Sequence, residues 1–232
     1  MLAYPQLARL PELRELAIND LHLVLPPNLS GILPEDGFLA LRKIAITSHL
    51  FKDAFDLIQM IPSSKLSEVF IEPTFDLDLD DVMVHNMAAA WPCLQLLFLG
   101  GEQKSTLHPR VTLLCLVHLA VHCPYLDHLK LVLDATRVPE YTRPRQTRLT
   151  HTLSVFDPAY SPITDPPAVA VFLSEVFSAI SFAFAVRDVP DPYKWKWGKV
   201  VELFPAFVSV RLAEMKCWEG SDLEEDSEDD TA

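Results

Sequence analysis

The chain has 232 residues, half of them hydrophobic, which is enough to bury the core of one large domain. Its formal net charge of −13 at pH 7 argues against nucleic-acid binding, which relies on clustered Lys and Arg. There is no secretory signal at the N-terminus and no CxxC pair among the four cysteines, so we expect a cytoplasmic or nuclear protein with reduced thiols.

A short hydrophobic pattern recurs along the chain every 24 to 32 residues. In each copy, apolar residues alternate as in a strand with one buried face. The five strong copies are LPELRELAI (10–18), LALRKIAIT (39–47), SKLSEVFIE (64–72), WPCLQLLFL (91–99) and CPYLDHLKL (123–131). Weaker copies occupy 149–156, 177–185 and 204–212.

Helices are expected between these strands. Residues 82–90 and 113–121 carry apolar stripes at helical spacing, and Asp80 and Asp81 suit the N-cap and first turn of the earlier helix. Proline cannot continue a helix, so Pro92 and Pro124 predict helix ends at Trp91 and Cys123. The same pattern recurs at Leu10-Pro11 and Phe204-Pro205, where we predict the same turn into a strand.

A strand and a helix in each unit of this length are typical of a leucine-rich repeat. We therefore predict an α/β solenoid of about eight irregular repeats over 1–218, a horseshoe arc with a concave parallel sheet and convex helices. The segment 168–186 is long and apolar enough to suggest a membrane span. Glu175 near its middle instead favours a buried helix followed by a buried strand.

Residues 78–100, 113–135 and 168–180 resemble the leucine-rich-repeat region of fungal, basidiomycete-like, F-box proteins. In that family the F-box docks on a cullin-type ubiquitin ligase, and the repeats recruit the protein to be ubiquitinated. The resemblance implies a protein partner that is a ubiquitination substrate. No F-box is recognisable, so an interaction with the cullin-ligase adaptor is expected only if an F-box lies upstream. We expect either a fragment or a short relative that cannot dock on the ligase.

One cluster raises the alternative of a zinc enzyme. His118 and His122 share a helix face and precede Cys123, but the Glu that follows the first His in zincins is replaced here by Leu119. His128 is expected on the strand, pointing away from that helix. We interpret the two histidines as partly exposed and Cys123 as a small buried group.

Two further patterns are weighed in the same way. Asp76, Asp78 and Asp80 have calcium-loop spacing, yet Asp81 and Met87 stand where such a loop needs Gly and Glu. The lysines and tryptophans of KWKWGK (194–199) could stack on bases or meet a membrane, but we favour a loop whose aromatics pack on the last helix.

The charge is concentrated at the C-terminus. Eight acidic residues lie within 219–232, and we predict a disordered acidic tail there, with Ser221 and Ser227 in a context that acidophilic kinases accept. Residues 135–148 form a long connection with four arginines, a candidate second surface for an acidic partner.

Outward residues of the strands are the candidate partner-binding site. The residues expected on the concave face are Glu15, Asn19, Lys43, Thr47, Glu68, Phe70, Glu72, Leu96, Phe98, His128, Lys130, Thr152, Ser154 and Phe156. Exposed aromatics such as Phe70, Phe98 and Phe156 are frequent interface anchors.

Catalytic and nucleotide-binding signatures are missing from the sequence: no GxSxG, GxGxxG or GxxxxGK[ST] occurs. We therefore expect a non-catalytic protein-recognition module without cofactor or metal, binding neither nucleic acid nor membrane. The main alternative is a freestanding leucine-rich-repeat scaffold unrelated to ubiquitin, and a less favoured one is the histidine-based metalloenzyme.

Overall fold

The computed structural model describes residues 12–19, 40–47, 65–71, 79–100, 108–141, 151–183 and 192–221. These residues form strands and helices in alternation towards the C-terminus. In chain order the elements are β1 (Glu15–Asn19), β2 (Lys43–Thr47), β3 (Glu68–Ile71), α3 (Asp81–Ala90), β4 (Leu96–Leu99), α4 (Leu114–His122), β5 (His128–Leu131), β6 (Thr152–Asp157), α5 (Pro166–Val176), β7 (Ala179–Phe182) and α6 (Lys194–Ser221).

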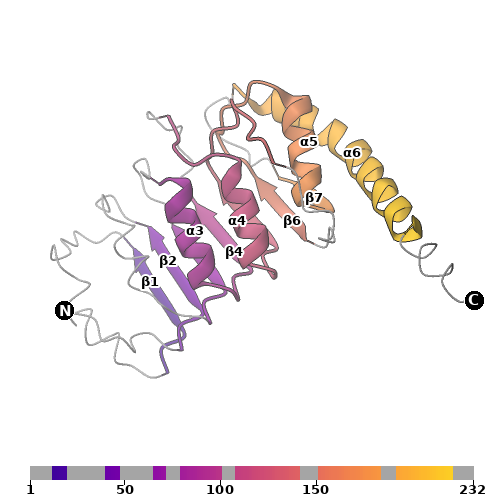
Figure 1. Ribbon diagram of the computed structural model, residues 1–232. Coiled ribbons are helices and arrows are strands. Elements are labelled where there is room, and N and C mark those ends of the chain that lie inside the picture. Colours follow the sequence, from indigo (N-terminus) through magenta and orange to yellow (C-terminus); the bar gives the residue numbers. More distant parts are fainter. Residues whose placement is uncertain are drawn as a thin grey trace, which may run out of the picture.

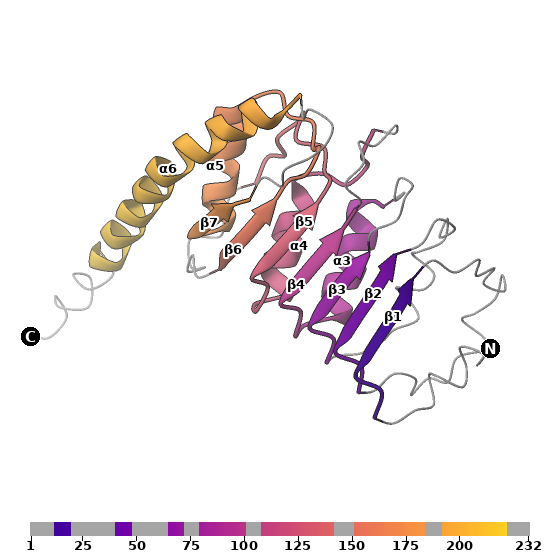
Figure 2. The same cartoon turned by 180° about the vertical axis from the view of Figure 1, so that it is seen from behind.

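The strands form one seven-stranded sheet in the order β1-β2-β3-β4-β5-β6-β7. Every neighbouring pair is parallel, so each strand pairs with the next one along the chain. Helices α3, α4 and α5 lie side by side on one face of the sheet (Figure 1). The opposite face is turned towards the viewer in Figure 2. The predicted α/β class, with a parallel sheet and helices on one side, is confirmed.

The core lies between the sheet and the helix layer. Leu41, Leu66, Leu94 and Leu126, one from each of four consecutive strong copies, are all at most 1% exposed. The inward strand residues next to them are also buried: Ile44, Ile46, Val69, Ile71, Leu97, Leu99, Leu129 and Leu131. Each such side chain contributes about 1.5–3 kcal/mol by leaving water. Because one strand has only a narrow apolar face, neighbouring units are needed to bury it.

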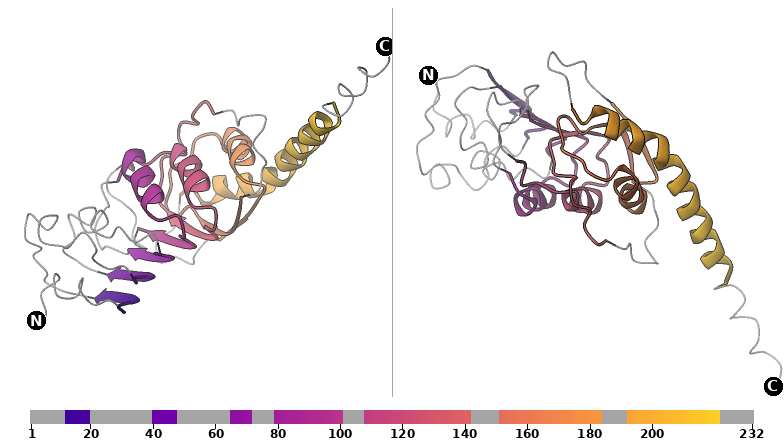
Figure 3. Two further views of the ribbon diagram at one scale, coloured as in Figure 1. Left: turned by 60° about the horizontal axis from the view of Figure 1, so that its bottom comes forward. Right: turned by 90° about the horizontal axis from the view of Figure 1, so that it is seen from above.

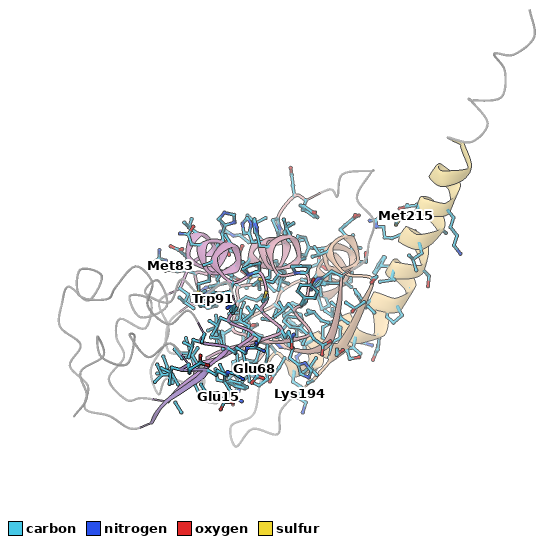
Figure 4. The ribbon with its side chains drawn as sticks, turned by 90° about the horizontal axis from the view of Figure 1, so that it is seen from below. Glu15, Glu68, Met83, Trp91, Lys194 and Met215 are labelled. Carbon is cyan, nitrogen blue, oxygen red and sulfur yellow. The ribbon has the colours of Figure 1, made fainter. Side chains whose placement is uncertain are left out.

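Helices α3 and α4 begin and end as their sequences predict. The Asp80 carboxylate accepts a hydrogen bond from the Met83 backbone N–H at 3.0 Å and caps α3. At the other end, Trp91 and Cys123 are the C-caps, with nearly equal dihedrals of φ −123°, ψ 63° and φ −117°, ψ 72°. Each is followed by proline, and the chain turns there into β4 or β5. Figure 4 shows Trp91 between the helices and the sheet.

The apolar stretch 168–186 contains most of α5 and all of β7. Asp165 caps α5 by accepting from the Ala168 N–H at 3.2 Å, and Pro166 occupies the first turn, where its missing N–H does no harm. The helix is buried as predicted, but β7 alternates between exposed and half-buried residues, so the prediction of a buried strand is wrong. Among the helices that the structure describes, none is both long and apolar enough to cross a membrane.

The predicted eighth strand, 204–212, is instead part of α6. Pro205 lies inside this helix, and the KWKWGK segment forms its first turns rather than a loop. Trp197, Val200, Phe204 and Val208 are all buried, a spacing that matches one helix face. These four side chains belong to the same core cluster as α5, and the two views of Figure 3 show α6 beside α5 at the C-terminal end of the sheet. The helix ends at Ser221, and the remainder of the predicted tail lies outside the described residues.

Candidate functional site

The sheet face turned away from α3, α4 and α5 carries two rows of side chains, which we call the helix-distal face. The strand register aligns Glu15, Lys43, Glu68, Leu96, His128 and Val155 in the first row, and Ala17, Ala45, Phe70, Phe98, Lys130 and Asp157 in the second. Figure 4 shows Glu15 and Glu68 on the side away from the helices. Eight of the predicted outward residues therefore lie together on one surface.

The centre of this face is apolar. Phe70 and Phe98 pack edge to face, with ring centroids 5.1 Å apart and ring planes at 80°. Leu96 lies in the adjacent row, and all three side chains are half-buried. In the second row, Ala17 of β1 and Ala45 of β2 come before the two phenylalanines. Because alanine side chains are small, the aromatic rings lie beside a part of the face with short side chains.

A lysine and a glutamate border the aromatic pair. The Nζ atom of Lys43 lies 2.8 Å from the Glu68 carboxylate and 5.2 Å from the centroid of the Phe70 ring. The hydrogen bond that Lys43 donates to the Glu68 carboxylate, followed by the charge of Glu68, raises the pKa of Lys43 above the ordinary value. Both side chains are about 40% exposed, so their ion pair adds little to stability but leaves two charges available to a partner.

On the other side of the apolar centre, His128 pairs with Asp127. The His128 Nδ1 lies 2.9 Å from the Asp127 carboxylate. The pKa of Asp127 lies below its usual value because the Ser154 hydroxyl donates to the carboxylate, assisted by the charge of His128. This carboxylate is therefore ionised at neutral pH, and His128, on the strand and away from α4, is where the sequence predicted it.

Lys130 differs from the prediction of an exposed residue. It occupies the helix-distal face beside Phe98, but only 8% of it is accessible. The register places it next to Asp157, which is 6% exposed and accepts a hydrogen bond from the Ala159 N–H at 2.8 Å. Because it is buried, Lys130 exposes little surface on the helix-distal face.

The prediction that Phe156 faces outward is wrong. A register shift in β6 lies between Leu153 and Phe156, so that both of these residues are buried and Val155 takes the outward place beside His128. The Phe156 ring packs 5.7 Å from Phe182 and 6.1 Å from Trp197. Burying the larger side chain in the core is the reason for the shift.

Some predicted residues receive no structural account. Glu72 lies outside the described residues, as do Asp76 and Asp78 of the calcium-loop pattern and residues 142–148 of the arginine-rich connection. For Asn19 and Thr47 the structure describes the backbone alone, and each ends its strand next to the other. Thr152 and Ser154 are exposed on β6, as expected.

The histidines of the zinc alternative lie on the helix side of the sheet. His118 and His122 are both half-buried on α4, and His85 of α3 contacts both rings. Sequence reasoning missed His85. A signal was present: His85 stands six residues before Trp91 and His118 five before Cys123, which places them near the same level of adjacent helices. Over the described ranges no group of three or more His, Cys, Asp and Glu side chains is arranged to hold a metal ion.

Cys123 is a buried structural residue. Its Sγ lies 3.6 Å from the carbonyl oxygens of Ala88 and Trp91, both in the preceding unit. Burial raises the pKa of its thiol from 9.0 to about 12, and burial also raises that of Cys115. Both thiols are therefore protonated at neutral pH, as expected of buried structural cysteines.

We expect alkylation to distinguish these thiols. Cys93 is exposed and should react with iodoacetamide at pH 8, whereas Cys123 should react at least about a hundredfold more slowly, because it is buried and burial raises its pKa to about 12. Peptide mapping by mass spectrometry of the native protein measures both rates. Modification of Cys115 or Cys123 as fast as Cys93 would contradict their placement in the core, and urea-unfolded protein serves as the control in which all should react.

The fold and the face define an α/β protein of stacked parallel strand and helix units, with a mixed aromatic and charged sheet surface. Comparison with protein-family models, with curated proteins and with solved structures finds no match. The function is therefore inferred from the residues themselves.

Proposed function

We propose that this chain is a leucine-rich-repeat module that binds a protein partner through its helix-distal sheet face. The observation that carries this proposal is the half-exposed centre of that face, where Phe70, Phe98 and Leu96 are grouped beside the Lys43–Glu68 ion pair. A cluster of aromatic and aliphatic side chains bordered by charges is the composition of a protein-binding hot spot. Repeats of 24 to 32 residues that alternate strand and helix support the leucine-rich-repeat assignment.

The resemblance of residues 78–100, 113–135 and 168–180 to fungal F-box proteins supports a narrower context, substrate recruitment to a ubiquitin ligase. In this context the face binds the protein to be ubiquitinated and the chain itself performs no chemistry. The buried thiols of Cys115 and Cys123 are in keeping with a role that does not use them as nucleophiles.

Truncating the aromatic pair tests the binding face. We expect the double variant Phe70→Ala and Phe98→Ala to lose partner binding by about tenfold or more, since hot-spot truncations commonly have such effects. The measurement is quantitative affinity capture from cell extract with wild type and variant side by side. Val121→Ala is the matched control, because Val121 is 67% exposed on α4, on the other side of the molecule.

Two outcomes separate the alternatives. If the double variant folds, as far-ultraviolet circular dichroism reports, and captures the same partners at wild-type levels, binding through this face is wrong. If binding depends on the face, the protein is then expressed from its native gene and purified by affinity capture. Co-purification of the cullin adaptor supports the ligase context. Recovery of the partner without the adaptor, and without its ubiquitination, favours a freestanding scaffold.

A further inference from the structure

Three histidine rings meet between consecutive helices on the side of the molecule opposite the binding face. His85 of α3 lies with its ring centroid 4.6 Å from that of His118 and 5.0 Å from that of His122, both on α4. The ring planes cross at 70° and 77°. All three side chains are half-buried, so the rings form part of the contact between α3 and α4.

The closest approach joins two nitrogen atoms of the same kind. The Nδ1 atoms of His85 and His118 are 3.3 Å apart, a hydrogen-bonding distance. One of the two must carry a proton and the other must not, because a ring nitrogen accepts only when it is unprotonated. The bond therefore exists only while at least one of the two imidazoles is neutral.

The charges around the rings do not stabilise three cations. Burial lowers the pKa of His118, and the charges of His85 and His122 lower it further, against the opposing charge of Asp81. Asp81 lies one turn before His85, and its two carboxylate oxygens are 2.7 Å from the N–H and the hydroxyl of Thr112. On the next helix, α5, Glu175 is ion-paired with Arg211 of α6. One partly engaged carboxylate thus faces three titratable rings.

We propose that His85, His118 and His122 form a proton-sensitive contact, in which neutral rings hold α3 against α4 and protonation separates the two helices. Above the ordinary histidine value of 6.5, the lowered pKa of His118 keeps its ring neutral, and the hydrogen bond to His85 can form. As the pH falls below that value the unfolded or opened form binds protons more readily than the closed one. The contact therefore loses stability from about pH 6.5 downwards.

The separation affects the middle of the sheet. In the chain α3 leads into β4 and α4 follows β4, the strand that carries Leu96 and Phe98. The inference is independent of the proposed partner, because it concerns the chain alone and is tested without one.

Amide hydrogen exchange at pH 7.5 and pH 5.5 tests the contact, expressed as protection factors that correct for the pH dependence of intrinsic exchange. For the wild type we expect the protection factors of α3 and α4 to fall about tenfold at the lower pH. Two like charges about 5 Å apart on a partly exposed surface repel each other enough to change an opening equilibrium by about that factor. His85→Gln removes both ring pairs between the helices and should show less than a twofold change.

His108→Gln is the control, because the His108 side chain is 66% exposed and lies outside the three-ring contact, and it should behave as the wild type. His118→Gln provides a second variant that removes the Nδ1 pair alone, and it should give a loss between the other two. The proposal is overturned if wild type and His85→Gln lose protection equally, or if the wild type loses none at pH 5.5.

Discussion

Replacing Trp197 by alanine is expected to release α6 from the body of the protein at a cost of about 3–5 kcal/mol. The Trp197 side chain is fully buried, and its ring packs 6.1 Å from that of Phe156 in β6. Its Nε1–H donates to the Ser161 carbonyl oxygen at 3.0 Å, so the truncation also leaves a buried acceptor without its donor. The residue thus joins the last helix to the last units of the sheet.

Trp195 gives a matched control two residues earlier in the same helix. It is 66% exposed, and its replacement by alanine should change stability by less than about 0.5 kcal/mol. Trp197→Phe keeps most of the apolar volume but loses the N–H, and should lie between the two. Urea unfolding followed by circular dichroism, with limited proteolysis of α6 as a local readout, measures all three. Equal stability of the two alanine variants would show that α6 is not docked through Trp197.

The central repeat units could be predicted from the sequence because each unit contacts its immediate neighbours. Leu66, Leu94 and Leu126 are all buried in one core cluster, so a pattern that repeats along the chain becomes a layer of the core. Trp91 and Cys123 could be paired for the same reason, since each ends a helix before a proline.

The structure of the C-terminal end, where α6 replaces the predicted strand, could not be predicted in this way. At Phe204-Pro205 the local proline signal predicted a helix end, but burial of Trp197, Phe204 and Val208 along one helix face outweighs one missing hydrogen bond. One turn after the proline, the Ser209 hydroxyl donates a hydrogen bond to the Pro205 carbonyl oxygen at 2.9 Å. A terminal unit has a neighbour on one side only, and here a helix rather than another strand covers its core.

The sequence predicted which strand residues form the rows of the candidate site, but it did not predict the register shift in β6 or the contacts between helices. Alternation along a strand identifies outward residues such as Phe70 and Phe98 as long as the strand is regular. The register shift in β6 exchanges the two faces at Val155 and Phe156, and nothing in the alternation itself marks it. The contact of His85 with His118 and His122 depends on how two helices pack, which residue spacing within one helix does not state.

Leu96 and Leu97 in β4 test which side of the sheet is core and which is available to a partner. Leu97 is fully buried, and the register places it between Val69 of β3 and Leu129 of β5. Leu97→Ala should destabilise the protein by about 2–5 kcal/mol, through lost burial and the cavity it leaves. Leu96 points the other way and is half-buried, so Leu96→Ala should cost about 1 kcal/mol or less.

The two variants should differ in their effect on binding. Leu96→Ala removes part of the apolar centre beside Phe70 and Phe98, and we expect it to weaken partner capture while the protein remains folded. Leu97→Ala should bind as the wild type at a temperature where circular dichroism shows it folded, because its side chain does not reach the helix-distal face. Similar losses of stability for Leu96→Ala and Leu97→Ala would mean that both sides of β4 are covered. The helix-distal face would then be part of a core rather than a surface for a partner.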